Sequence, residues 1–529
     1  MPNPDRLTAL DATFLHLEDA KGVTMHVASC MLFEGEIPPY DDFLEAIESR
    51  LHLVPRYRQR LATVPLGQGR PVWVDDPHFN ARYHVRHTAL PRPGSEQQLK
   101  NLAGRVFSQQ LDREKPLWEI WLVDKLEGDR FALLAKTHHA LVDGISGVDI
   151  TTVLFDAAPD APRPSPPERP WVARPLPSDA QLLGAALIER ATLPTEIARG
   201  VRAVFRGPRR VISRVAEDAA AVGALASGGF APAPHTPLNV SISPHRRFDW
   251  VEADLDRFKG IKNVLGGTIN DVVLSAVSLA LGRWLRDRAF PVDDLTLKAM
   301  VPVSVRADAE RGALGNKVAA MWAPLPVWSE DPVETFALVH AEMGQLKESG
   351  QAVGATVLTS LSDFAPPTIM SQAARLQSRQ RFINLVVTNV PGPQYPLYLL
   401  GRRMVATEPM VPLAENLALG IAIMSYDGKL HFGLNGDYDA MADIAYLASD
   451  LRAAVAALGE AAGLPSQEAE ARPTPEVREP AAAPTPSGHE VEVALEAESD
   501  APPMAFSMPR SRPGTRSPRR DAGRARRST

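Results

Sequence analysis

The stretch FALLAKTHHALVDGISG, residues 131–147, decides how the rest of the chain is interpreted. It begins with five apolar residues, which are typical of a buried strand, and the adjacent histidines His138 and His139 follow. A histidine at the end of a buried strand can be held firmly and still face a cavity, and imidazole suits proton transfer near neutral pH. A lone histidine, with Asp143 capping the next helix, would be a core residue. Two histidines followed by Asp143 and Gly144 favour an active site.

Length and composition limit the classes of protein to which the chain can belong. The 529 residues are too many for one core and predict two or three units, and a hydrophobic fraction of 45% can fill them. The net charge of −6 gives no reason to expect a specific nucleic-acid partner. Cys30 is the only cysteine, so neither a disulfide framework nor a thiolate metal cluster is expected, and a reducing, cytoplasmic compartment fits best.

The sequence also bears on membrane contact. Its start, MPNPDRLTALDATFLHLED, has no basic leader followed by an apolar core, so no secretory signal is predicted. No run approaches the roughly 18 uninterrupted apolar residues of a spanning helix. Contact with a membrane or lipid droplet is therefore expected to be peripheral at most.

Changes in composition predict four regions. Residues 1–158 form an N-terminal half that carries the histidine stretch, and residues 159–236 form a proline-rich linker with a helical crossover. The crossover is arginine-rich on one side; packing on the protein is favoured over binding to anionic lipid, because its apolar face is short and interrupted. Residues 237–464 form a second half. Residues 465–529 are predicted to be disordered, since they cannot bury enough apolar surface.

Local patterns predict strands and helices in both halves. Residues 118–126 and 130–136 are expected to pair as a hairpin around Gly128. In the second half a long helix is expected to begin at Thr268 or Asn270, either of which can cap it. The expected strands of that half are 250–255, 297–305, 318–325, 384–389, 418–425 and 431–435.

The residues His138, His139, Asp143 and Gly144 match the HHxxxDG signature of coenzyme A-dependent acyltransferases. That superfamily includes chloramphenicol acetyltransferase, condensation domains of peptide synthetases, and the bacterial wax ester synthase/diacylglycerol acyltransferases. The signature alone identifies only the superfamily.

Further blocks resemble the last of these families and extend the resemblance over about residues 5–460. They come in the family's order, and several separated blocks are more specific than one motif. The blocks are Asp11, Phe14, Met25, His26 and Val27; Asp112, Pro116, Leu117 and Trp118; Asn270 and Asp271; VPVSVR ending at Arg306; Gly315 and Asn316; TNVPGPQYPLYLLG at 388–401; and Ser425 to Gly428.

The resemblance implies an α/β fold of two chloramphenicol acetyltransferase-like halves with mixed sheets. A linker and helical crossover join the halves, and an active-site tunnel lies between them. The predicted division of the chain agrees with this architecture but could not have supplied its topology.

The resemblance implies an O-acyltransferase that moves a long-chain acyl group from acyl-coenzyme A to a hydroxyl. His139 stands at the family's catalytic position as the general base. Asn270 is the candidate hydrogen-bond donor to the oxyanion, although a pure capping role is an equal alternative. No covalent intermediate, metal or permanently bound cofactor is required, because acyl-coenzyme A is a co-substrate.

The other motif residues are expected to support the site. Successive side chains at a strand end point to opposite sides, so only one of the two histidines can readily face the tunnel, and His138 is expected to pack behind His139. In the superfamily the Asp143 position is structural and pairs with an arginine, for which Arg306 is the candidate. Gly144 completes the motif.

Alternatives of other classes stay open on the sequence. A peptide-synthetase-like condensation domain shares the histidine motif, but carrier domains are missing and the PLW and TNVPGP blocks point elsewhere. A non-catalytic lipid-surface protein would need only the amphipathic helices, and the complete histidine motif argues against it. The acceptor is diacylglycerol or a long-chain alcohol, with diacylglycerol favoured by family resemblance alone.

Overall fold

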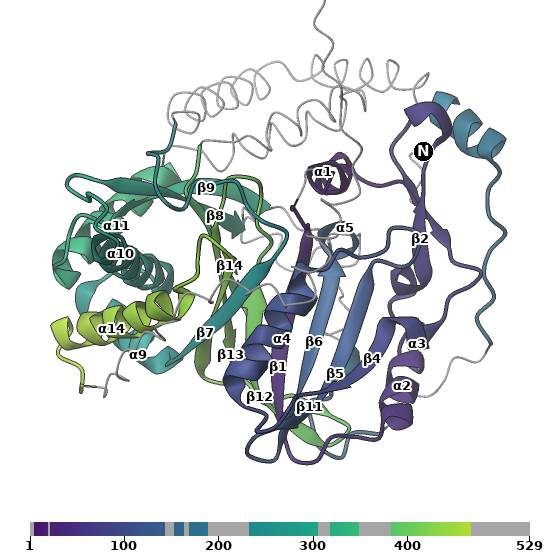
Figure 1. Ribbon diagram of the computed structural model, residues 1–529, viewed down its shortest axis with the longest axis horizontal. Helices are drawn as coiled ribbons and strands as arrows, with labels where there is room; N and C mark the ends of the chain where they lie inside the picture. Colours follow the sequence, from purple (N-terminus) through teal and green to yellow (C-terminus); the bar gives the residue numbers. More distant parts are fainter. Residues whose placement is uncertain are drawn as a thin grey trace, which may run out of the picture. The chain divides into compact units, whose positions relative to one another are not determined.

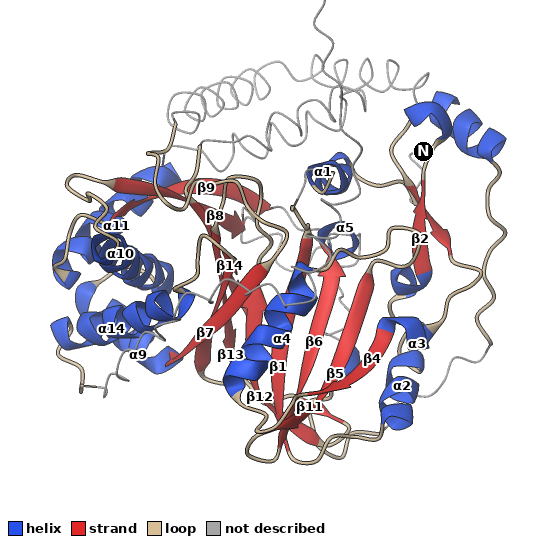
Figure 2. Ribbon diagram, viewed as in Figure 1, coloured by secondary structure: helices blue, strands red, loops and turns tan. Residues whose placement is uncertain are grey.

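The computed structural model describes residues 5–19, 22–142, 153–162, 169–188, 232–304, 318–348 and 382–466. Within them the chain forms two six-stranded sheets and one two-stranded sheet, with helices packed against them (Figures 1 and 2). The prediction of an α/β fold with mixed sheets is confirmed. The predicted disordered tail lies outside the described residues from 467 onward.

The N-terminal sheet has the strand order β11-β12-β1-β6-β5-β4. The expected hairpin is present, since β5 and β6 pair antiparallel and Gly128 and Asp129 in the turn both have positive φ. β4 and β5 are the parallel pair of this sheet. The bounds are β1 His26–Glu34, β4 Val85–Ala89, β5 Trp118–Leu126, β6 Arg130–His138, β11 Tyr398–Leu399 and β12 Arg402–Met410.

The C-terminal sheet has the order β7-β14-β13-β10-β8-β9. β10 runs parallel to both of its neighbours, β13 and β8. The other neighbouring strands of this sheet pair antiparallel. The central strands are apolar because both faces are covered. The bounds are β7 Arg246–Asp254, β8 Thr296–Ser304, β9 Val318–Pro326, β10 Leu385–Pro391, β13 Leu419–Tyr426 and β14 Lys429–Asp437.

Strands β11 and β12 come late in the chain but complete the N-terminal sheet. β12 pairs antiparallel with β1, with Cys30 opposite Glu408. β12 also contacts β13 and β14, so it touches both large sheets. The predicted second half, 237–464, therefore contributes strands to the first half, an exchange that the sequence did not indicate.

The longer helices pack on these sheets. α9, α10, α11 and α14 gather against the C-terminal sheet (Figure 2) and share its hydrophobic core. α4 begins with a capping box made by Ser95 and Gln98. The bounds of the longer helices are α1 Ala9–Leu17, α2 Tyr40–Glu48, α4 Glu96–Ser108, α9 Leu255–Leu265, α10 Ile269–Asp287, α11 Pro332–Glu348 and α14 Ile444–Ala461. The short helices are η1 Pro55–Arg58, η2 Pro65–Gly67, α3 Ala81–His84 and α5 His139–Val142. In the two-stranded sheet, β2 Gln59–Ala62 pairs with β3 Val72–Asp75.

The length and hydropathy of the described helices bear on whether any of them could cross a membrane. No single helix in the described part of the chain is long and apolar enough to cross a bilayer. The pair α9 and α10 meets the length and composition limits only when taken together across a 98° bend.

A buried lysine attaches α4 to the N-terminal sheet. Lys136 on β6 donates to the carbonyl oxygens of Val106 (3.0 Å) and Gln109 (2.7 Å), which lie at the C-terminal end of α4. Its third partner is Glu119 on β5, at 2.6 Å. Burial lowers the pKa of Lys136, and Glu119 opposes that effect. The ammonium group therefore supplies donors to carbonyls at the end of the helix, where intrahelical amide donors run out.

Glycines allow two close backbone contacts between the N-terminal and C-terminal sheet regions, one between β14 and β12 and one between α4 and β7. A Cβ on Gly433 of β14 would overlap the carbonyl oxygen of Pro409 on β12. A Cβ on Gly104 of α4 would lie 2.7 Å from the carbonyl oxygen of Arg246 on β7. Backbone, which cannot swing aside as a flexible side chain can, forms the obstacle in both places.

We expect Gly433→Ala to lower the free energy of unfolding by at least the roughly 1–3 kcal/mol typical of over-packed cores, because β12 and β14 must move apart. Urea unfolding followed by circular dichroism measures the change. The control is Gly344→Ala at an exposed position of α11: nothing lies within 4 Å of its Cβ position, and removing a helix glycine stabilises by up to about 1 kcal/mol. Equal midpoints for the two variants would show that the sheets do not require this close approach.

Candidate active site

The two histidines are fixed through their backbone at the junction of β6 and α5. The amide of His138, the last residue of β6, donates to the carbonyl of Leu117 at 2.9 Å. The amide of His139, the first residue of α5, donates to the carbonyl of Met25 at 2.9 Å. The PLW block before β5 and the Met25–His26 block before and at the start of β1 are thus brought to the histidine motif.

The imidazole of His138 is held inside the protein. Its side chain is fully buried, and the amide of Ala140 donates to its Nδ1 at 3.1 Å. Because Nδ1 accepts a hydrogen bond, the neutral ring carries its proton on Nε2. Nε2 faces the carboxylate of Glu18, with 3.7 Å between Nε2 and Oε2. Both ring nitrogens of His138 are therefore oriented toward protein groups.

Glu18 is a buried carboxylate at the end of α1 that the sequence did not single out. Its Oε1 accepts from the amide of Met25 at 2.9 Å, and its Oε2 accepts from Nη2 of Arg113 at 2.9 Å. Burial raises the pKa of Glu18, but His138, the Met25 amide and Arg113 together lower it from 4.5 to about 2. Arg113 also donates to the carbonyl of Leu15 at the end of α1. The charged carboxylate thus joins α1, β1 and the histidine motif.

His139 has a different environment from its neighbour. Its side chain is only partly buried, and its ring lies against that of Phe14 on α1, with 4.1 Å between centroids and 30° between planes. α1 and α5 pack together, so Phe14 fixes the ring from one side. A held but partly exposed imidazole has the properties that a general base needs.

His26 lies opposite His138 in the β1–β6 register and is a core residue. It is fully buried, and its Nε2 donates to the carbonyl of Phe107 at 2.5 Å. Burial is the main reason that its pKa falls to about 3. His26 therefore stays neutral and links β1 to α4.

Asn270 lies in the first turn of α10 and is partly buried. Thr268 is the N-cap, since its hydroxyl accepts from the amide of Asp271 and the carboxylate of Asp271 accepts from the amide of Thr268. The alternative in which Asn270 caps the helix is therefore wrong. Asp271 is further bound by Nδ1 of His340 at 2.9 Å.

Asp143, Gly144 and Arg306 lie outside the described residues. The pairing of Asp143 with Arg306 stays a prediction.

A pocket of about 1030 Å³ lies beside α1. Its described lining mixes apolar and charged side chains and includes neither histidine of the motif. Ala12 and Leu15 of α1 line it, whereas Phe14 of the same helix contacts His139. Charged lining residues include Arg60, Asp76, Arg113 and Lys115. The pocket therefore adjoins the site across α1 without containing its reactive group.

Glu18→Gln should weaken the protein in a pH-dependent way. The pKa of Glu18 is lower in the folded protein than the ordinary 4.5, so its charge stabilises the fold above about pH 4.5 and this contribution is lost as the pH falls toward 2. We expect a deficit on the order of 3 kcal/mol at pH 7 that shrinks between pH 5 and pH 3. Urea unfolding at these pH values measures it, with exposed Glu127→Gln as the control. A deficit independent of pH would contradict the electrostatic explanation.

The sequence matches two family descriptions over most of its length. Residues 7–273 match the wax ester synthase/diacylglycerol acyltransferase catalytic domain, and residues 314–459 match the C-terminal domain of the same family. The chain is 33% identical over 460 residues to the probable diacylglycerol O-acyltransferase tgs1 of Mycobacterium tuberculosis, covering 86% of this chain and 96% of that protein. The corresponding figures for the probable enzyme tgs2 of the same organism are 32% over 475 residues, with 87% and 100% covered.

Solved structures give a consistent result. The wax ester synthase/diacylglycerol acyltransferase from Marinobacter aquaeolei VT8 is 27% identical, with a TM-score of 0.60, and the match covers 87% of this chain and 100% of that one. A starter condensation domain of rhizomide synthetase matches at 14% identity and a TM-score of 0.53, covering 87% and 95%, which shows a shared fold only. Since both family domains match in order and the relatives match over nearly their whole length, the chain belongs to the wax ester synthase/diacylglycerol acyltransferase family.

Proposed function

We propose that the protein transfers a long-chain acyl group from acyl-coenzyme A to the hydroxyl of diacylglycerol, forming triacylglycerol. The observation that carries the proposal is the contrast between the two histidines of the family motif. His138 is fully buried and oriented by Ala140 and Glu18, whereas His139 is partly exposed and held by Phe14. One imidazole is thus enclosed by protein groups, and the other is partly exposed beside an aromatic ring.

In the proposed reaction His139 is the general base. An alcohol is a poor nucleophile near neutral pH, so the base takes the hydroxyl proton as the oxygen attacks the thioester carbonyl. The tetrahedral intermediate collapses by breaking the carbon–sulfur bond, and the imidazolium of His139 returns the proton to the coenzyme A thiolate. The products are an ester and free coenzyme A, with no acyl-enzyme intermediate.

Supporting groups act around this base. His138, fixed by Glu18, holds the strand end from which His139 projects. Asn270 donates a hydrogen bond to the oxyanion; its amide has no capping task, since Thr268 caps α10. The pairing of Asp143 with Arg306 and a supporting role for Gly144 are carried over as predictions, since all three residues lie outside the described part of the chain. Substrates reach the base through a tunnel between the halves.

The names of the relatives support the choice of acceptor. Those named above in Mycobacterium tuberculosis are called diacylglycerol O-acyltransferases, whereas the Marinobacter protein carries both activities in its name. Diacylglycerol is therefore the proposed acceptor, with long-chain alcohols as a second one. Acyl-coenzyme A is a co-substrate, and the reaction requires no resident cofactor. A condensation-domain function is weaker, because that likeness extends only to the fold.

The proposed acceptors are insoluble in water, which favours action at the surface of a membrane or lipid droplet. The experiment uses purified full-length protein, labelled palmitoyl-coenzyme A, and vesicles that contain equal amounts of diacylglycerol and hexadecanol. Triacylglycerol should be the main labelled ester, and part of the protein should sediment with the vesicles. Wax ester as the main product would reverse the acceptor assignment, and free fatty acid without either ester would overturn the function.

The same assay separates the two histidines. His139→Ala should lose about 10²–10⁴-fold in rate, the usual value of general-base catalysis, with an unchanged unfolding midpoint. His138→Ala should retain a substantial fraction of activity and instead lose stability, because it removes the buried partner of Glu18. A stable but inactive His138→Ala enzyme would assign the base to the other ring.

Asn270→Ala should lower the turnover number by about 10²–10³-fold, the effect of removing one oxyanion donor elsewhere. Capping of α10 by Thr268 should leave the unfolding midpoint near that of the unmodified protein. Thr268→Ala is the matched control, since it should cost about 1 kcal/mol of stability with little loss of turnover. A fully active Asn270→Ala enzyme would remove Asn270 from the mechanism.

A further inference from the structure

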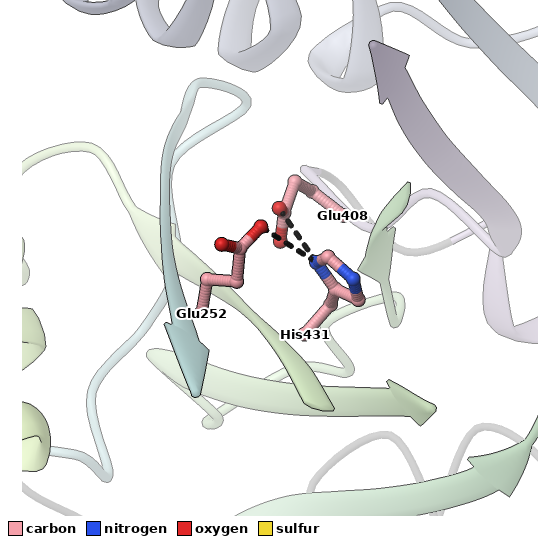
Figure 3. A group of neighbouring side chains, drawn as sticks. All are labelled: Glu252, Glu408 and His431. Atoms are coloured by element: carbon pink, nitrogen blue, oxygen red, sulfur yellow. Dashed lines mark hydrogen bonds and ion pairs between the residues drawn. The ribbon is translucent and has the colours of Figure 1, made fainter. Parts of the chain in front are cut away.

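Three side chains from both large sheets meet at one point away from the histidine motif. Glu252 on β7 lies opposite His431 on β14 in the C-terminal sheet, and Glu408 comes from β12 of the N-terminal sheet. Figure 3 shows the two carboxylates and the imidazole pointing toward one another. None of the three belongs to a block that carried the family resemblance.

The spacing of these groups suits a metal ion. Nδ1 of His431 lies 3.0 Å from Oε1 of Glu408 and 3.8 Å from Oε2 of Glu252. One ligand atom from each residue lies within 4.8 Å of the other two. Two ligands at about 2.1 Å from a tetrahedral zinc are roughly 3.4 Å apart, so small side-chain movements would complete the geometry.

The buried part of the cluster contains a carboxylate oxygen that no hydrogen-bond donor of the described residues reaches. His431 and Glu408 are buried, with side chains 0% and 1% exposed. Among the residues that the structure describes, no hydrogen-bond donor reaches Oε2 of Glu408. A buried carboxylate oxygen without a donor is costly, and a bound cation would remove that cost.

The nearby lysines are already engaged. Lys100 is bound to Asp249 at 2.8 Å and to Glu96 at 2.9 Å. Lys429 binds Oε1 of Glu252 at 2.5 Å, which leaves Oε2 directed at His431. Lys429 therefore orients one carboxylate as an outer-shell group does in metal sites.

We propose that Glu252, Glu408 and His431 form a structural site for a divalent cation. Zinc fits best, because it accepts imidazole nitrogen together with carboxylate oxygen, and a water molecule would complete its tetrahedron beside the three protein ligands. His431 binds through Nδ1 and releases any proton held there. The ion connects β12 to the β7–β14 pair and so fastens the two large sheets together. It has no part in the acyl transfer at His139.

The test uses tag-free full-length protein treated with a chelator and then dialysed. Zinc chloride titrated by calorimetry should bind with one ion per chain at this site and a Kd of roughly 1 µM or tighter. Cobalt chloride should give the visible absorption of a tetrahedral site, and added zinc should raise the thermal unfolding midpoint, because the ion binds the folded state.

Glu252→Gln is the decisive variant. Its side chain is 37% exposed, so its replacement leaves the buried pair intact, yet it should lower zinc affinity at least tenfold and abolish the cobalt absorption. Asp256→Asn is the matched control: Asp256 is a surface carboxylate paired with Lys259 at 2.8 Å, as Glu252 is with Lys429, and this variant should bind zinc as the unmodified protein does.

Two results would overturn the proposal. If the unmodified protein binds no zinc, the three side chains form only a hydrogen-bonded polar cluster. If Glu252→Gln binds zinc and cobalt as well as Asp256→Asn does, the metal binds elsewhere.

Discussion

The buried charge of Glu18 is the interaction on which the arrangement of the site depends. Its carboxylate accepts from the Met25 amide and from Arg113, and it faces the imidazole of His138. Three segments distant in sequence are therefore held around one ion that water does not reach. A buried carboxylate is tolerated only when its lone pairs are used, and here each partner also fixes an element that the histidine motif touches.

Buried polar side chains also connect separate elements in the N-terminal sheet. Lys136 uses its three donors on α4 and Glu119, and His26 uses Nε2 on the carbonyl of Phe107. Both side chains connect a strand to α4, and Lys136 also contacts a neighbouring strand. The position of His139 at the end of β6 is thus set by polar contacts as well as by apolar packing.

Much of the fold could be predicted from local sequence, because strand and helix periodicity are local properties. The hairpin at Gly128 was found for this reason, and the separate motif blocks located the family. Glu18 and Arg113 were missed, because charged residues that are not themselves part of a recognised motif usually face water. Only their pairing in the fold reveals their burial. Their positions were a usable signal, because Glu18 lies between Phe14 and Met25 and Arg113 lies beside Asp112, within blocks that resemble the family. The cluster of Glu252, Glu408 and His431 combines distant strands, so no spacing rule applies to it.

The place of β12 has a consequence for how the protein forms during synthesis. β1 is made first, but its partner on one side, β12, leaves the ribosome only after some 400 residues, as the pairing of Cys30 with Glu408 shows. Until then β1 presents an open edge with unpaired amides and carbonyls, which is a template for association with other chains. Pairings between such distant segments also form slowly. The N-terminal sheet, and with it the setting of the histidines, is therefore completed late, and the nascent chain must be protected over most of its translation.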